Sequence, residues 1–99
     1  MEPKPIVYTQ IDKNAVHAIQ FGKDDVLTND VDRKVRDKQL QKAQALGNLD
    51  KHHVRIRFKN ANGEDLETTV TIWAVTINHV VLKGENLIPI TSITEIKLY

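Results

Sequence analysis

The stretch of residues 54–59, VRIRFK, constrains the fold of this chain more than any other part of its sequence. Apolar and basic residues alternate strictly through it. A period of two is typical of a β-strand with one buried face, because successive side chains point to opposite sides. We therefore predict a strand here, with its apolar face on the core and its basic face outside.

The turn after this strand determines how it pairs with the next one. A three-residue loop at residues 61–63, ANG, needs Gly63 in the left-handed conformation and pairs Phe58 with Leu66. The core face then stays apolar. A two-residue turn would instead place Glu67 opposite Phe58 on the core face, so we predict the three-residue loop.

The second strand is predicted to neutralise most of this basic face. The same register sets Lys59 opposite Asp65 and Arg57 opposite Glu67. Opposed charges across an antiparallel pair contribute about 0.2–1 kcal/mol each. The basic residues of this strand therefore predict a solvated, charge-paired strand face more strongly than a nucleic-acid-binding stripe.

Arg55 is the basic residue that this register leaves without an acidic partner. It lies opposite Thr69, and His53 is nearby. These residues keep a binding function open for the strand.

Residues 29–47, NDVDRKVRDKQLQKAQALG, predict one α-helix. Asn29 or Asp30 can accept hydrogen bonds from the first turn, and Gly47 can adopt the left-handed conformation that ends a helix. The apolar positions form a narrow stripe that can dock on another element but buries little alone. They are Val31, Val35, Leu40, Ala43 and Leu46.

Residues 1–28 are expected to form an N-terminal extension, partly ordered at best, before a domain of residues 29–99. The segment IVYTQI, residues 6–11, has modest strand-like content. Asp12 can also cap a short helix that ends at Gly22.

Short apolar segments follow the hairpin with tight connections. The apolar parity shifts at Trp73, as at a bulge or sharp bend in a strand that serves both sides of a small barrel. Later strands are predicted at residues 80–82, 87–90 and 93–98. We expect a mainly β (α+β) domain, an N-terminal α-helix followed by a five-stranded, strongly bent antiparallel small barrel.

Trp73 itself has two interpretations. At the parity shift we favour a buried plug in the barrel core. The alternative is an exposed aromatic anchor, the kind of residue that dominates protein-binding surfaces.

The order of helix, hairpin and short strands over about residues 30–98 resembles that of the Sm-like (SH3-type) small β-barrels. In WAVTINHVVL, Trp73, Ile77 and Asn78 match the aromatic, Met-like and Asn positions of the first motif of that family. IPITSITEI, residues 88–96, keeps the apolar spacing of the second motif. The resemblance implies a helix that caps a five-stranded barrel, and an RNA contact at Asn78.

Other RNA-binding positions of that family hold different residue types here. The acid of the family falls on Ala74, its base-stacking position on Thr76, and its Arg-Gly pair on Pro89-Ile90. Pro89 lacks the N–H that would bond a neighbouring subunit, which argues against ring assembly. A looser resemblance is to the small bacterial Rof-like inhibitors of the Rho termination factor, which implies a protein partner.

Composition limits the functions open to the chain. The net charge of +1 gives no basic excess for a dedicated nucleic-acid binder, and the lack of cysteine fits a reducing cytoplasm. No segment resembles a secretion signal or a membrane span. No spacing predicts a cofactor, a catalytic group or a metal site, and we interpret the histidines as surface residues. They are His17, His52, His53 and His79.

We expect a cytoplasmic, non-enzymatic binding module that acts as a protein-interaction adaptor or regulator. The alternative is weak binding of RNA or single-stranded nucleic acid through a basic strand and helix face. The partner and the oligomeric state are not defined by these patterns. The candidate binding surface comprises His53, Arg55, Arg57, Lys59, Trp73, Asn78, Arg33 and Arg36.

Overall fold

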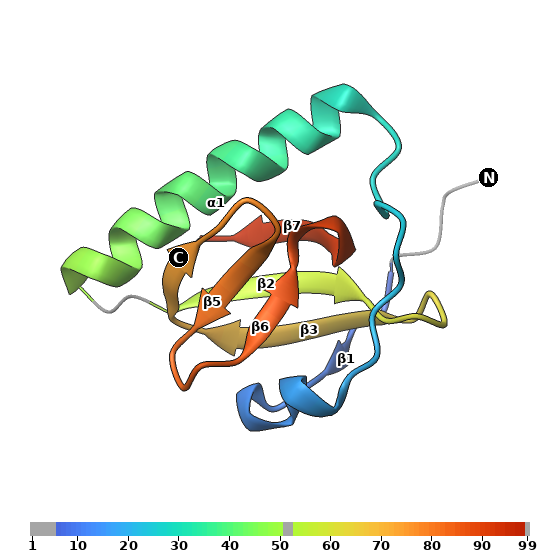
Figure 1. The fold of residues 1–99 in the computed structure, drawn as a ribbon, viewed down its shortest axis with the longest axis horizontal. Coiled ribbons are helices and arrows are strands. Elements are labelled where there is room, and N and C mark those ends of the chain that lie inside the picture. Colours follow the sequence, from blue (N-terminus) through green and yellow to red (C-terminus); the bar gives the residue numbers. More distant parts are fainter. Residues whose placement is uncertain (1–5, 51–52, 99) are drawn as a thin grey trace.

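The computed structural model describes residues 6–50 and 53–98, and in these residues the chain forms one α-helix, two 3-10 helices and seven strands (Figure 1). In chain order they are β1 (Thr9–Gln10), η1 (Lys13–Ala18), α1 (Asp30–Asp50), β2 (Val54–Lys59), β3 (Asp65–Val70), β4 (Ile72–Val75), β5 (His79–Leu82), β6 (Leu87–Pro89), η2 (Ile90–Ser92) and β7 (Ile93–Lys97).

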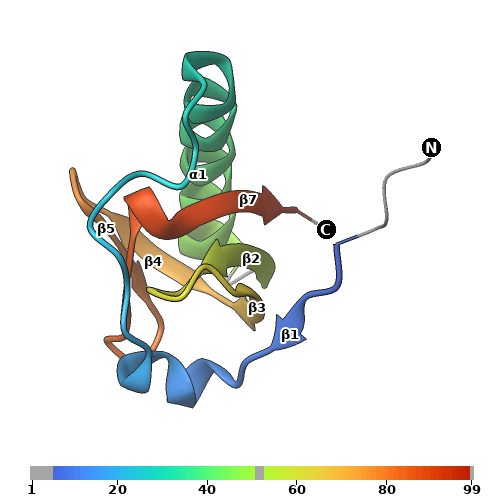
Figure 2. The ribbon, with the colours of Figure 1, turned by 90° about the vertical axis from the view of Figure 1, so that its right-hand side faces the viewer.

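The strands form two sheets, with the orders β1-β3-β2-β7 and β4-β5-β6. β1 runs parallel to β3, and the other pairs are antiparallel. The chain passes from the first sheet to the second at Thr71, between β3 and β4. α1 packs on β4 and β7, an end strand of each sheet, and so bridges the two sheets (Figure 2).

The predicted fold class is wrong. α1 lies in the middle of the chain, after β1 and η1, and the sheets of four and three strands do not close into a barrel. The physical reason lies at Thr71, where the chain leaves the first sheet. The sequence pattern favours one bent strand where the structure has two strands, β3 and β4, in different sheets. The pattern also gives no sign that α1 packs between β7 and β4, the end strands that would have to pair to close a barrel.

The hairpin of β2 and β3 confirms the predicted three-residue turn, because Phe58 pairs with Leu66. Gly63 has a φ of 79°, a left-handed conformation that favours glycine. The side chain of Asn60 stabilises the turn by accepting a hydrogen bond from the backbone N–H of Glu64 at 3.0 Å. The apolar face of β2 is therefore turned to the core, as predicted.

One core joins both sheets, α1 and η1. Its members are buried apolar side chains whose alternation along β2, β3 and β5 follows the pleat of the strands. They are Val16, Leu40, Ala43, Val54, Ile56, Phe58, Leu66, Val70, Ile72, Val80, Leu82, Ile88, Ile93 and Ile96.

α1 begins where the sequence predicts, and Leu40 and Ala43 of the predicted docking stripe are buried, but the first part of the stripe is not. The side-chain oxygen of Asn29 accepts a hydrogen bond from the N–H of Val31 at 2.7 Å, which confirms the predicted cap. Val31 and Val35, predicted to lie in the docking stripe, are exposed, whereas Arg36 is buried beside Leu40. The buried face of α1 therefore carries a charge that needs a partner inside the fold.

The prediction that Gly47 ends α1 is wrong, because the helix continues to Asp50. Gly47 lies where α1 packs against β4. A Cβ atom at this position would overlap the carbonyl oxygen of Ile72 and lie 3.5 Å from Cγ2 of Thr71. The helix needs glycine here for its packing against the strand and not for its termination.

The segment before α1 packs on both sheets, since β1 pairs with β3 and η1 contacts β3 and β6. Asp12 caps η1 as predicted, and its carboxylate accepts the N–H of Asn14 at 2.8 Å. The helix ends at Ala18, earlier than predicted. Val16 of η1 is fully buried, so this segment supplies part of the core.

Candidate protein-binding surface

The residues selected from the sequence lie on three separate parts of the molecule. One part is on the first sheet, one is on α1, and the third is on the second sheet. β2 and the residue before it carry His53, Arg55, Arg57 and Lys59, α1 carries Arg33 and Arg36, and β4 with its following turn carries Trp73 and Asn78.

The arginines of β2 converge on one buried acid, Glu67 of β3, which is 2% exposed. Its carboxylate lies 2.6 Å from Nε of Arg57 and 3.2 Å from Nε of Arg55. It also accepts a hydrogen bond from the side chain of Gln10 at 2.6 Å. The prediction that Arg55 lacks an acidic partner is wrong, because Glu67 is its diagonal neighbour across the strand pair and a long side chain reaches it.

Arg57 is held by two further groups. It donates a hydrogen bond to Glu95 of β7 at 3.2 Å, and its guanidinium lies 4.2 Å from the ring centroid of Tyr8. The hydrogen bond to Glu67 is the main cause that raises the pKa of Arg57. Burial alone would raise the pKa of Glu67, but hydrogen bonds from Gln10 and Arg57 and the nearby positive charges bring it below its ordinary value.

The remaining candidates of this face lie near the two ends of β2. Lys59 Nζ lies 3.9 Å from Oδ1 of Asp65, which confirms the predicted pair, although side chains this exposed gain little from pairing. His53 is exposed and lines a shallow cavity of about 500 Å³ with Lys13 and Thr69. The β2 face is thus mostly charge-paired within the chain.

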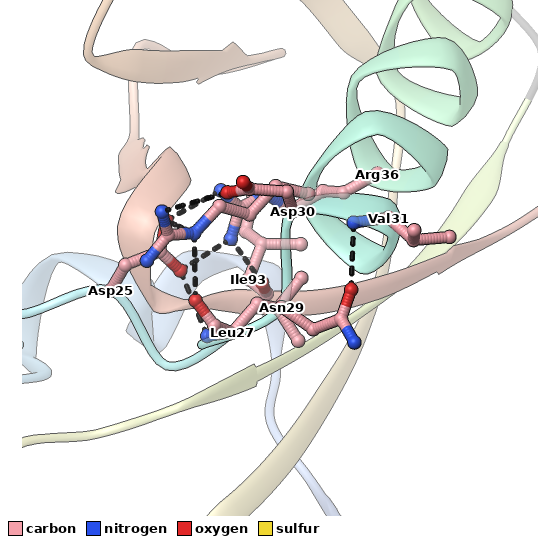
Figure 3. Close-up of polar contacts among 8 residues, drawn as sticks. Asp25, Leu27, Asn29, Asp30, Val31, Arg36 and Ile93 are labelled. Carbon is pink, nitrogen blue, oxygen red and sulfur yellow. Dashed lines mark hydrogen bonds and ion pairs between the residues drawn. The ribbon is translucent and has the colours of Figure 1, made fainter.

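Arg33 and Arg36 bind the segment that leads into α1, and Figure 3 shows Arg36 beside Asp25 and Ile93. Two nitrogens of Arg36 donate to the carboxylate of Asp25 at 2.8 Å each, and one also donates to the carbonyl oxygen of Ile93 at 3.0 Å. Arg33 donates to the carbonyl oxygen of Leu27 at 2.8 Å. The hydrogen bond from Arg36 is the main cause that lowers the pKa of Asp25. Arg36 is 4% exposed, so its charge is used inside the fold.

Trp73 is 46% exposed, so the favoured prediction of a core plug is wrong. The parity shift has the predicted cause, a bulge in β4. Ile72 pairs with Leu82 and Ala74 with Val81, and Trp73 is the extra residue between them. Ile72 is buried and the next residue, Trp73, points to the opposite, solvent side of the strand. The extra residue then returns Val75 to the core side, where it packs against the core.

An apolar row crosses the solvent side of the second sheet, and we call Trp73, Ala74, Val81 and Leu87 the outer row. Val81 of β5 pairs with Ala74 on one side and with Leu87 on the other. Leu87 is 47% exposed. The alternate residues of these strands, such as Val80, are buried in the core, so the outer row is carried on a packed sheet.

A shallow cavity of about 370 Å³ lies beside Leu87, between η1 and β6. Its apolar lining residues are Val16, Ile19, Phe21, Leu87 and Pro89. Our sequence reasoning did not select Leu87, although its alternation with the buried Ile88 was a signal for an outward side chain. The cavity is also lined by His17, His79, Glu85 and Asn86, so it adjoins the outer row with a mixed polar and apolar surface.

Asn78 lies in the turn between β4 and β5, next to the exposed Ile77. Its carbonyl oxygen accepts a hydrogen bond from the N–H of Ile90 at 2.9 Å. The backbone of Asn78 therefore connects this turn to η2, and its side chain remains exposed.

Within residues 6–50 and 53–98, no three His, Asp or Glu side chains gather closely enough to hold a metal ion. His52 lies outside this range. None of the helices in the described part of the chain has the length and apolar character that a membrane crossing requires. Compared with protein-family models, with curated proteins and with solved structures, the chain matches none of them.

Proposed function

We propose that the chain is a non-enzymatic binding module that holds a protein partner on the outer row and acts as an adaptor or regulator. Trp73 carries this proposal, because its large aromatic side chain is about half exposed beside other apolar residues. Tryptophan is enriched among the residues that dominate protein–protein binding energies. The cysteine-free sequence supports a reducing compartment, and we place the module in the cytoplasm.

The surroundings of Trp73 support a protein ligand of apolar character. Ala74, Val81 and Leu87 extend the contact across three strands, and the cavity beside Leu87 offers space for a side chain of the partner. Binding to a surface that is already ordered loses less conformational entropy than binding to a mobile one. A hydrophobic centre with a more polar rim is also the usual composition of a protein interface.

The alternative of nucleic-acid binding receives less support from the charges. Arg55 and Arg57 share the carboxylate of Glu67, and Arg36 binds Asp25. Phosphate binding depends on basic side chains whose charge is available to the ligand. These three of the predicted basic side chains are therefore committed to contacts within the fold.

Replacing Trp73 by alanine tests the proposal. Tagged wild-type and W73A proteins are used to capture partners from the native cell, and the captured protein is then purified and titrated. We expect W73A to bind it about 30-fold more weakly, because truncation of a central tryptophan costs about 2 kcal/mol or more of binding free energy. Far-UV circular dichroism verifies that the variant is folded.

Val7→Ala provides the matched control, since Val7 is an exposed apolar residue outside the outer row. This variant should bind the partner with wild-type affinity. Equal affinities of W73A and wild-type protein would contradict a binding site at Trp73. An affinity that falls steeply with salt and extends to bare RNA would favour the nucleic-acid alternative instead.

A further inference from the structure

A groove between α1 and the end of β7 has the features of a second binding site, separate from the outer row. The groove has a volume of about 360 Å³ and is lined by Val35, Lys38, Gln39, Lys42, Ile96 and Leu98. We propose that it binds a short, extended, acidic segment of a partner protein that carries an apolar side chain. The site is independent of Trp73 and does not rest on the function proposed above.

The backbone of β7 is oriented so that it can meet an extended segment. β7 is the last strand of its sheet, and it pairs with β2 on one side. The N–H of Ile96 points away from β2 and donates to the side chain of Gln39 at 3.0 Å. Ile96 and Gln39 both line the groove, so this side of β7, away from β2, faces it. An extended chain can hydrogen-bond to such an edge.

The floor of the groove is apolar and its rim is basic. Val35 is exposed on α1, opposite Ile96 and the half-buried Leu98. Lys38 and Lys42 stand one helical turn apart on the rim. A ligand that satisfies both parts needs an apolar side chain for the floor and carboxylates for the lysines.

The charges of Lys38 and Lys42 are available to a ligand, in contrast to those of other basic residues on α1. Arg33 and Arg36 bind Asp25, whereas among the described residues neither Lys38 nor Lys42 has an acidic group within ion-pair distance. Acidic groups on the ligand would therefore find these lysines unoccupied. Charge complementarity thus favours an acidic segment over a neutral or basic one.

The period of an extended chain defines a suitable sequence pattern. Alternate side chains of a strand lie on the same side, about 6.7 Å apart. An apolar residue flanked at two positions on either side by acidic residues can therefore place all three side chains in the groove. The long side chains of Lys38 and Lys42 are able to reach the two carboxylates.

A titration with defined peptides tests the proposal. The full chain, labelled with ¹⁵N, is titrated to about 1 mM with the peptide Thr-Asp-Thr-Leu-Thr-Asp-Thr, a range in which NMR detects weak binding. A second peptide replaces both Asp residues by Lys, and a third replaces Leu by Ser. We expect saturable shifts of amide signals around Val35, Lys42 and Leu98 with the first peptide only.

Two variants relate these shifts to the groove. Lys38→Gln combined with Lys42→Gln changes only exposed side chains, and it should weaken binding of the first peptide about tenfold. Trp73→Ala should leave this binding unchanged, so the two proposed sites are tested separately. The proposal is overturned if the acidic peptide causes no shifts in the groove, if the lysine or serine peptide binds equally well, or if the double variant keeps wild-type affinity.

Discussion

Replacing Gly47 by alanine creates a conflict between the local preference of α1 and its packing on β4. An alanine Cβ would overlap the carbonyl oxygen of Ile72 and lie 3.3 Å from the carbonyl carbon of the same residue. Both atoms belong to the backbone of β4, so no side-chain rotation can relieve the overlap. Either the helix or the strand must move.

The two effects of this substitution have opposite signs. Alanine is favoured over glycine inside a helix by about 1 kcal/mol, which alone would stabilise the variant. Overpacking a well-packed interior typically costs about 1–3 kcal/mol, and a backbone obstacle places Gly47 at the upper end of that range. A shift of α1 would also loosen the contacts of the buried Leu40 and Ala43. We therefore expect the free energy of unfolding to fall by about 2 kcal/mol.

Urea unfolding followed by far-UV circular dichroism measures this change for wild-type protein and for Gly47→Ala. Gly22→Ala is the matched control, because the nearest atom to its added Cβ is 4.0 Å away. The control should stay within about 0.5 kcal/mol of the wild type. If Gly47→Ala is more stable than wild type by about 1 kcal/mol, the close approach of α1 and β4 is refuted and helix propensity governs this position.

Two further predictions concern Glu67 and Asp25, the acids that bind arginines within the fold. Glu67→Gln leaves Arg55 and Arg57 without their shared counter-charge, so it should lower the free energy of unfolding by about 3 kcal/mol. The exposed control Glu64→Gln should change the free energy of unfolding by less than about 0.5 kcal/mol in the same urea assay. Stability should also fall as the pH decreases below about 4.5, because lowered pKa values make Asp25 and Glu67 bind protons more weakly in the folded than in the unfolded chain. Urea titrations between about pH 6 and 3 should show a smaller decline for Glu67→Gln, and an unchanged decline would contradict this assignment.

The hairpin of β2 and β3 was predictable because two independent constraints agreed. The alternation of residues 54–59 requires one apolar face, and Gly63 supplies the left-handed residue of a three-residue turn. Only the pairing of Phe58 with Leu66 satisfies both. Information of this kind is contained within about twenty neighbouring residues, and tertiary packing does not override it.

The pairing of Arg55 with Glu67 is a diagonal contact within the same hairpin, but the other partner of Glu67 and the direction of Trp73 depend on more distant parts of the chain. Glu67 gains Gln10 as a further partner only because β1 adds to β3. The parity shift revealed the bulge in β4, but a bulge turns a side chain inward or outward according to which face of the sheet is covered. In this fold α1 and the first sheet cover the other face, and Trp73 remains outside.

The error about α1 has a more general physical cause. A helix that packs along the edge of a sheet meets backbone N–H and C=O groups, so its buried face must carry polar side chains that satisfy them. Arg36 donates to the carbonyl oxygen of Ile93, and Gln39 accepts the N–H of Ile96. A search for an apolar stripe excludes such positions and selects Val35, which is exposed. The same edge-covering role of α1 therefore explains both the buried charge at Arg36 and the apolar surface left beside β7, where we place the second binding site.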